Sequence, residues 1–170
     1  AVYVATVLIG LAILLGVYLL IIAIIGRMNP LKFLKSSREV MLLALSTSSS
    51  AAVMPLTLST TEEKLGVRSG ISRFVIPLGT TINMGGTALY QGVATLFLAQ
   101  VFQVDIGISG MILVVVMATG ASIGSPGTPG VGIVILATIL ESVGIPPTGI
   151  ALIIGVDRIL DMCRTSVNVT

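Results

Sequence analysis

The chain has 170 residues, of which 55% are hydrophobic and only 9% are charged, and its mean hydropathy is +1.11. About a quarter of the residues of a soluble domain are charged, so this composition excludes a disordered chain and an ordinary cytosolic enzyme, and it indicates a membrane protein. The net charge of +2 comes from nine scattered basic residues, which form no stripe that could follow a nucleic acid.

Several features needed for catalysis are absent. The sequence has no histidine and a single cysteine, Cys163, which cannot form an internal disulfide and is interpreted as a packing residue. It contains no P-loop, no G-x-S-x-G motif and no zinc-ligand spacing. We therefore expect neither an enzyme nor an enzymatic cofactor. Because Ala1 is not an initiator methionine, we expect the chain to belong to a longer protein.

The stretch 1–26 is predicted to be a spanning helix. It carries no charge and consists mainly of Leu, Ile, Val and Ala. At about 1.5 Å of rise per residue, it can cross a hydrocarbon core of about 30 Å with some tilt. The stretch 31–62 follows a break at Pro30, and its centre is the serine-rich run Ser46–Ser50. That run supplies the turn residues that a helical hairpin needs at its tip.

The remaining chain divides into three predicted elements. The stretch 70–100 is a spanning helix that should be broken at Gly85 and Gly86, because glycine disfavours a helix interior. The stretch 106–142 is a second hairpin with a tip rich in Gly, Pro and Ser. The stretch 148–170 is a final helix that carries charges among apolar residues.

The loops indicate a topology. The loops at 27–38 and 62–73 hold four and three Lys/Arg, whereas the loops near 101–109 and 141–149 hold none. If the basic loops are cytoplasmic, each hairpin begins and ends on one side of the membrane, and the two hairpins enter from opposite faces. Each re-entrant hairpin precedes a spanning helix. Inverted repeats with broken helices are typical of transporters, so we expect an all-α membrane fold of this type.

The last helix carries the strongest functional signal. Asp157, Asp161, Arg164, Thr165 and Asn168 are spaced so that they share one helix face. Charges at such a depth require compensation. Internal ion pairs are one interpretation; the other is a solute site in which Arg164 binds a carboxylate and Asp161 binds an ammonium group. The neighbouring Arg158 points elsewhere and is interpreted as a snorkelling or counter-ion residue.

The tips and the helix break are further candidates. Serines at a hairpin tip present hydroxyl and N–H groups to an anion, although they also serve as helix caps. Unwound backbone at the second tip and near Asn83 frees carbonyl groups for a cation such as Na⁺, although a hinge or a packing kink is the alternative. The methionines and the few aromatic residues form no cofactor motif and are interpreted as packing.

Together these motifs resemble the dicarboxylate/amino acid:cation symporters, the glutamate transporter family. The resemblance covers essentially the whole chain and corresponds to the C-terminal half of that family. Its motifs are the serine-rich tip, residues 83–87, residues 121–132 and residues 157–168. It implies an elevator-type transport domain that moves against a trimeric scaffold, with most of that scaffold in a missing N-terminal half. It also implies a multi-pass protein of the cell (inner) membrane, in contact with lipid.

By motif position, the resemblance implies the site residues. Substrate contacts are expected at Ser49, Ser50, Met84, Thr87, Thr128, Gly132, Asp161, Arg164, Thr165 and Asn168. One Na⁺ is expected at Gly79, Asn83 and Asn168, and a second at Thr81, Ser122, Ile123 and Ser125, mostly through backbone carbonyls.

Three departures from the family pattern stand out. Gly85 occupies the place of an aspartate that belongs to a third cation site, so we expect coupling to fewer Na⁺ or to H⁺. Many members have an arginine at the position of Ser48 or of Met162, and this chain has neither. The sequence also ends at Thr170, before a further aspartate ligand of the family.

The expected function is symport of an acidic amino acid, glutamate or aspartate, with Na⁺ or H⁺. A C4-dicarboxylate symporter of the same fold would need Arg164 and would leave Asp161 with a structural role. A neutral amino acid exchanger is disfavoured because Arg164 would lack a partner. An ion channel and a structural membrane-assembly fragment stay open as other classes; saturable uptake would distinguish a transporter from the channel.

Overall fold

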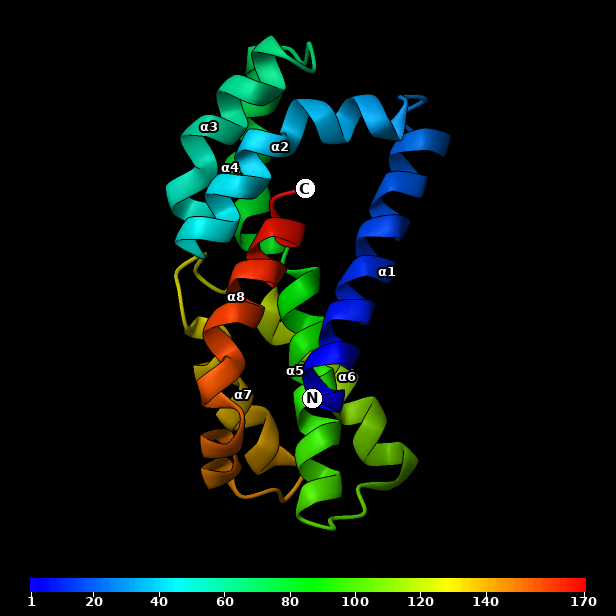
Figure 1. The fold of residues 1–170 in the computed structure, drawn as a ribbon, viewed down its shortest axis with the longest axis vertical. Helices are drawn as coiled ribbons and strands as arrows, with labels where there is room; N and C mark the ends of the chain where they lie inside the picture. The colour runs from blue at the N-terminus through cyan, green and yellow to red at the C-terminus, as the bar shows by residue number, and fades with distance from the viewer.

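The computed structural model describes all 170 residues and contains helices and no strands, which confirms the predicted all-α fold (Figure 1). The elements in chain order are α1 (Val2–Ile24), α2 (Pro30–Thr47), α3 (Ser50–Glu63), α4 (Ser69–Ile82), α5 (Gly85–Val101), α6 (Gly107–Ser122), α7 (Val131–Ser142), the 3₁₀ helix η1 (Pro147–Leu152) and α8 (Ile154–Asn168).

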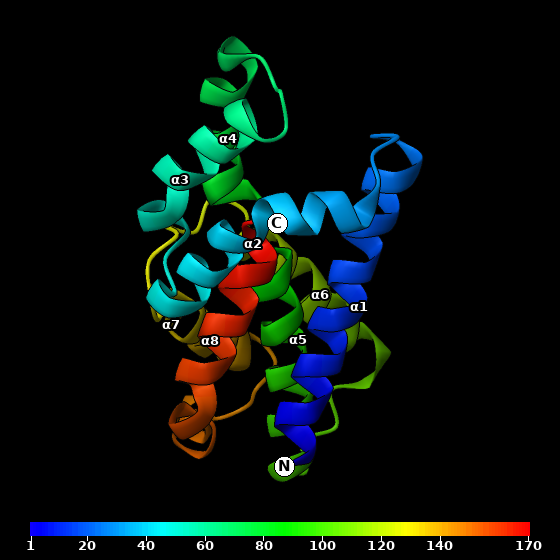
Figure 2. The ribbon, with the colours of Figure 1, turned by 45° about the horizontal axis from the view of Figure 1, so that its top comes forward.

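Helix α1 is the one helix long and apolar enough to cross a membrane by length and composition. It runs along one side of the molecule, and α2 crosses from its end toward α3 (Figure 1). The loops α1–α2 and α3–α4 lie at the same end in the view of Figure 2, whereas the loops α5–α6 and α7–η1 lie at the other. The predicted basic loop 27–38 is mostly helical, because Lys32, Lys35 and Arg38 lie in α2 and only Arg27 lies in the α1–α2 loop. This arrangement agrees with both basic loops facing one compartment.

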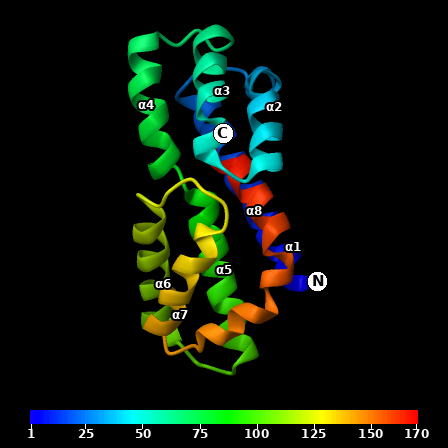
Figure 3. The ribbon, with the colours of Figure 1, turned by 90° about the vertical axis from the view of Figure 1, so that its left-hand side faces the viewer.

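Two helical hairpins, α2–α3 and α6–α7, approach each other from opposite ends, and their tips meet near the middle of the molecule (Figure 3). The contact between the tips is polar. The carbonyl oxygen of Gly127 accepts hydrogen bonds from the Ser49 hydroxyl at 2.8 Å and from the Ala51 N–H at 3.2 Å. Insertion of the hairpins from the two faces of a membrane stays a prediction, as do the element boundaries inferred from the sequence.

The first hairpin turns sharply because its serines end one helix and begin the next. Ser48 ends α2 with a left-handed backbone conformation at φ 53°. Ser49 then caps α3, since its Oγ accepts a hydrogen bond from the Ala52 N–H at 3.2 Å. The hairpin therefore needs only two residues outside its helices.

The predicted helix break lies between α4 and α5. The α-helix ends at Ile82 and begins again at Gly85, so Asn83 and Met84 lie outside both helices. The Met84 N–H bonds the Ile82 carbonyl and the Thr87 N–H bonds the Met84 carbonyl, which leaves the Asn83 carbonyl without a backbone partner. A helix end inside the molecule thus presents free carbonyl groups.

The main apolar core joins α1, α5, α7 and α8. It includes Val7, Leu11, Leu98, Leu136 and Leu160, each no more than 3% exposed. Helix α8 packs against α1, α2 and α5, so its polar face is enclosed between these helices and the hairpin tips. Cys163 packs against the same core, as predicted.

Candidate functional site

The polar face of α8 is buried in the protein. Asp157, Asp161, Arg164, Thr165 and Asn168 are each no more than 7% exposed. The helical spacing aligns them, and the packing of α8 against its neighbours removes them from solvent. Arg158, one position away from this face, is exposed, in agreement with the sequence-based interpretation.

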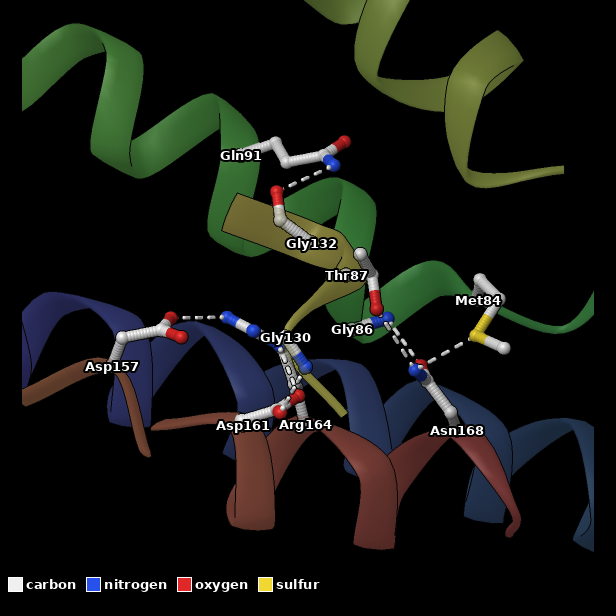
Figure 4. A network of polar contacts seen from close by, with 10 residues as sticks. All are labelled: Met84, Gly86, Thr87, Gln91, Gly130, Gly132, Asp157, Asp161, Arg164 and Asn168. Atoms are coloured by element: carbon white, nitrogen blue, oxygen red, sulfur yellow. Dashed lines mark hydrogen bonds and ion pairs between the residues drawn. The ribbon is translucent and has the colours of Figure 1, made fainter. Parts of the chain in front are cut away.

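Arg164 is held by two carboxylates (Figure 4). Its Nε donates to Asp161 Oδ1 and its Nη1 donates to Asp157 Oδ1, both at 3.0 Å. The guanidinium also lies over the ring of Tyr90, with Cζ 3.9 Å from the ring centroid, a favourable arrangement for a desolvated cation. Of the internal ion pairs considered from the sequence, the pair of Asp161 with Arg164 is therefore present, whereas Asp157 pairs with Arg164 and not with Arg158.

The ion pairs do not satisfy the whole guanidinium. Arg164 is 1% exposed, and its Nη2 has no hydrogen-bond partner. Nη2 lies beside Gly132, where an added Cβ would stand only 3.0 Å away. A buried charged donor without a partner is costly, and such groups are rare in folded proteins. The site therefore offers an arginine edge for a carboxylate.

Arg164 borders a small cavity with a volume of about 20 Å³. The walls come from both hairpin tips, the start of α5 and α8. The lining residues are Ser48, Ser50, Met84, Thr87, Ser125, Pro126, Gly127, Thr128, Val131, Gly132, Asp161, Arg164, Thr165 and Asn168. The cavity thus collects every predicted substrate contact except Ser49, whose hydroxyl is engaged with Gly127 and the start of α3.

Asn168 connects α8 to the start of α5. Its Oδ1 accepts the Gly86 N–H at 2.7 Å, and its Nδ2 donates to Thr87 Oγ1 at 3.1 Å and to Met84 Sδ at 3.4 Å (Figure 4). An added Cβ on Gly86 would lie 2.9 Å from Asn168 Oδ1 and 3.0 Å from the Arg164 carbonyl oxygen. Glycine at position 86 therefore permits the close approach of the two helices.

The residues predicted for one cation lie around the helix break. Gly79, Asn83 and Asn168 border a second cavity, which shares Ser50 and Asn168 with the first. The Asn83 Nδ2 donates to the Asn168 carbonyl oxygen at 2.8 Å, which draws the ends of α4 and α8 together. The grouping of these three residues agrees with the sequence-based expectation, and their role as ligands stays a prediction.

The residues predicted for the other cation lie where α4 meets the second tip. The Gly124 N–H donates to the Thr81 carbonyl oxygen at 2.8 Å, and the Ser125 N–H donates to the Ser122 carbonyl oxygen at 3.3 Å. Each carbonyl retains a second lone pair. Ile123 is 52% exposed, and of the four residues only Ser125 lines the cavity beside Arg164. A cation at this place stays a prediction.

The sequence alone did not identify several members of the site. Tyr90 was interpreted as packing, although its ring supports Arg164. Asp157 was assigned to the polar face but not to the site, although it binds Nη1. Gln91, whose Nε2 donates to the Gly132 carbonyl at 3.3 Å, was not considered. A polar residue in the middle of an apolar helix is the signal that could have identified Gln91.

The formal charge of the site is negative. Asp157 and Asp161 contribute −2 and Arg164 contributes +1, so the three buried side chains sum to −1. An anionic solute would make this sum more negative. Because buried charge is costly without compensation, binding of an anion here requires cations nearby.

Comparison with known proteins reveals a family. The model of the sodium:dicarboxylate symporter family matches residues 1–170. The chain is 48% identical over 168 residues to excitatory amino acid transporter 3 of Homo sapiens, and the matched region covers 98% of this chain and 32% of that protein. It is 44% identical over 170 residues to excitatory amino acid transporter 1 of Rattus norvegicus, and the matched region covers 99% of this chain and 31% of that protein.

The chain therefore belongs to the sodium:dicarboxylate symporter family, as the resemblance of its motifs indicated. It spans about a third of the length of these relatives. The family is one of transporters rather than enzymes, in agreement with the missing catalytic motifs.

Proposed function

We propose that the full-length protein is a symporter that carries an acidic amino acid, glutamate or aspartate, across a membrane together with Na⁺. The observation that carries this proposal is the Nη2 of Arg164, which is buried, has no partner and borders a polar cavity between two hairpin tips. A solute carboxylate supplies the acceptor that this group lacks.

The geometry supports a division of tasks within the site. The Nη1–Nη2 edge of Arg164 receives the side-chain carboxylate, assisted by Thr87. Asp161 receives the ammonium group: its Oδ1 accepts from Arg164 and its Oδ2 accepts from the Gly130 N–H at 3.1 Å, and each oxygen retains a lone pair. The second carboxylate lies toward Ser50 at the start of α3, where a helix N-terminus favours an anion.

The cations follow from the charge of the site. An acidic amino acid carries a net charge of −1, which brings the sum of site and solute to −2. We propose that Na⁺ compensates this charge at the carbonyl groups of Gly79, Asn83 and Asn168. We further propose that a second Na⁺ binds at the carbonyl groups of Thr81, Ser122, Ile123 and Ser125.

The exposed apolar surface of α1 indicates what surrounds this part of the protein. The hydrophobic surface of α1, with exposed residues such as Ile9, Ile13 and Leu20, suits contact with lipid or with an apolar scaffold. We propose a multi-pass protein of the cell membrane in which this transport domain moves like an elevator against the scaffold of the N-terminal half, within a homotrimer.

One observation favours a second candidate. Both oxygens of Asp161 already accept hydrogen bonds, from Arg164 and from Gly130. A purely structural Asp161 would suit a C4-dicarboxylate, which has no ammonium group. Competition for uptake by the full-length protein in proteoliposomes separates the two: aspartate should displace labelled aspartate at lower concentration than succinate does. Succinate displacing it more effectively would favour the dicarboxylate and would make Asp161 structural.

The experiment that tests the proposal changes Arg164. Arg164→Lys keeps the charge and loses the two-pronged geometry, and Arg164→Ala removes both. Each hydrogen bond to a charged group contributes about 1.5–3 kcal/mol, so losing two should weaken aspartate binding at least about 100-fold. Calorimetry with and without Na⁺ on the full-length protein measures this. Arg158→Ala, at an exposed position, is the matched control. Saturable aspartate uptake at the wild-type level in Arg164→Ala would refute the assignment.

A further inference from the structure

Helix α1 brings a tyrosine against the break between α4 and α5. The ring of Tyr18 reaches toward Gly85, the first residue of α5: an added Cβ on Gly85 would lie 2.5 Å from the Tyr18 hydroxyl oxygen and 3.5 Å from Leu14 Cδ2. A distance of 2.5 Å is far below van der Waals contact. The hydroxyl therefore occupies the space that any side chain at position 85 would need.

The same hydroxyl contacts Asn83. Tyr18 Oη donates to Asn83 Oδ1 at 3.4 Å, a long hydrogen bond, and the Asn83 Nδ2 donates to the Asn168 carbonyl oxygen at 2.8 Å. The second bond determines how the amide is oriented, because a carbonyl oxygen can only accept. Oδ1 must then face Tyr18, which offers a donor. The Asn83 amide is thus held from both sides.

Asn83 lies at the break between α4 and α5, where the direction of its backbone carbonyl group matters for a cation site. It ends α4 with φ −82° and ψ 63°, outside the helical region, and its carbonyl oxygen accepts no backbone hydrogen bond. The Asn83 N–H donates to the Gly79 carbonyl oxygen at 2.8 Å and completes the last turn of α4, but no backbone donor holds the Asn83 carbonyl group. The side-chain contacts of Asn83 therefore help to set the direction of this free carbonyl.

We propose that Tyr18 is a positioning residue for the Na⁺ site around Asn83, and that Gly85 is required because the Tyr18 hydroxyl occupies its side-chain space. This inference rests on the proposed sodium symport. The hydroxyl does not touch the cation; it fixes the Asn83 amide, and through it the carbonyl that faces the ion. Tyr18 and Gly85 form a matched pair, in which a change at either position separates the hydroxyl from Asn83.

The pair predicts a specific non-additivity. Tyr18→Phe removes the hydroxyl and keeps the ring. Gly85→Ala introduces a Cβ that displaces the hydroxyl, so it should have the same effect. In the Tyr18→Phe background the nearest ring atom to that Cβ is Cζ at 3.8 Å, an ordinary contact. Gly85→Ala should therefore add no further effect once the hydroxyl is gone.

The test is aspartate uptake by the full-length protein in proteoliposomes as a function of Na⁺ concentration. Tyr18→Phe and Gly85→Ala should each raise the half-saturating Na⁺ concentration about two- to tenfold, the range expected for one hydrogen bond. The maximal rate at saturating Na⁺ should stay within about twofold of the wild type. The double variant should match Tyr18→Phe. Tyr3→Phe, which removes a buried hydroxyl without a hydrogen-bond partner from the same helix, is the matched control.

The outcomes separate this inference from the proposed function. Wild-type Na⁺ dependence in Tyr18→Phe, or effects of the two single variants that add in the double variant, would overturn the role of Tyr18 and leave sodium symport intact. Wild-type uptake that is independent of Na⁺ would overturn both. Thermal unfolding of each purified variant identifies a folding defect, and if Gly85→Ala does not fold, the Tyr18→Phe result decides alone.

Discussion

Gly132→Ala tests whether the space beside Arg164 is where the solute binds. Gly132 lies in the first turn of α7, and an alanine Cβ there would lie 3.0 Å from Arg164 Nη2, 3.2 Å from Arg164 Cζ and 3.4 Å from Thr87 Cγ2. The substitution adds one methyl group and no charge. It acts only by filling space at the open edge of the guanidinium.

Arg164 has little freedom to move away from that methyl group. Its Nε and Nη1 are fixed by Asp161 and Asp157 at 3.0 Å, and its plane rests on Tyr90. Inserting a methyl group into a packed interior typically costs about 1–3 kcal/mol. Because the solute carboxylate should occupy the same space as the methyl group, we expect the substitution to raise the free energy of the aspartate-bound state. Aspartate binding should weaken about 5- to 150-fold.

The assay is isothermal calorimetry of aspartate with the purified full-length protein at saturating Na⁺, together with its thermal unfolding. Gly120→Ala is the matched control, because it lies in the same hairpin and its added Cβ would meet nothing within 4 Å. We expect the control to bind aspartate as the wild type does. Wild-type affinity in a folded Gly132→Ala would refute the conclusion that the carboxylate binds at this edge of Arg164.

Two further predictions concern packing and the contact between the tips. Gly86→Ala places a Cβ 2.9 Å from Asn168 Oδ1 and should lower the free energy of unfolding, measured by thermal unfolding, by about 1–3 kcal/mol. The control Gly92→Ala lies in the same helix, meets no atom within 4 Å and should not destabilise the protein. Equal effects of the two substitutions would contradict the close approach of α5 and α8 at Gly86. Ser49→Ala removes the hydrogen bond from the Ser49 hydroxyl to the Gly127 carbonyl and the N-cap of α3, so the two hairpin tips should separate more easily. Aspartate should then dissociate about two- to tenfold faster in stopped-flow measurements. An unchanged dissociation rate would mean that this contact does not restrain the tips.

Local sequence patterns determined the elements of the fold. Uncharged runs, the serine-rich run Ser46–Ser50 and the segment Asn83–Thr87 predicted the helices, a hairpin tip and the break, and helical spacing predicted the shared face of Asp161 and Arg164. These predictions are reliable because they depend on the period of one helix and on the backbone preferences of single residues. The family motifs can likewise be found from the sequence, because each consists of neighbouring residues in the chain.

Contacts between distant segments could not be predicted in this way. Ser49 and Gly127 are 78 residues apart, and their hydrogen bond depends on how two hairpins pack. The same holds for Tyr18 beside Gly85 and for Tyr90 beneath Arg164. Each depends on the distance and rotation between helices, which the packing of their apolar faces determines.

The sequence by itself indicated a membrane protein, because only 9% of its residues are charged, and it placed Asp157, Asp161 and Arg164 on one face of the last helix. Only the tertiary structure decided what those charges do. It showed that two carboxylates satisfy part of Arg164 and leave Nη2 free beside a cavity. Periodicity aligns side chains along one helix, but whether a buried donor finds a partner depends on every element packed around it.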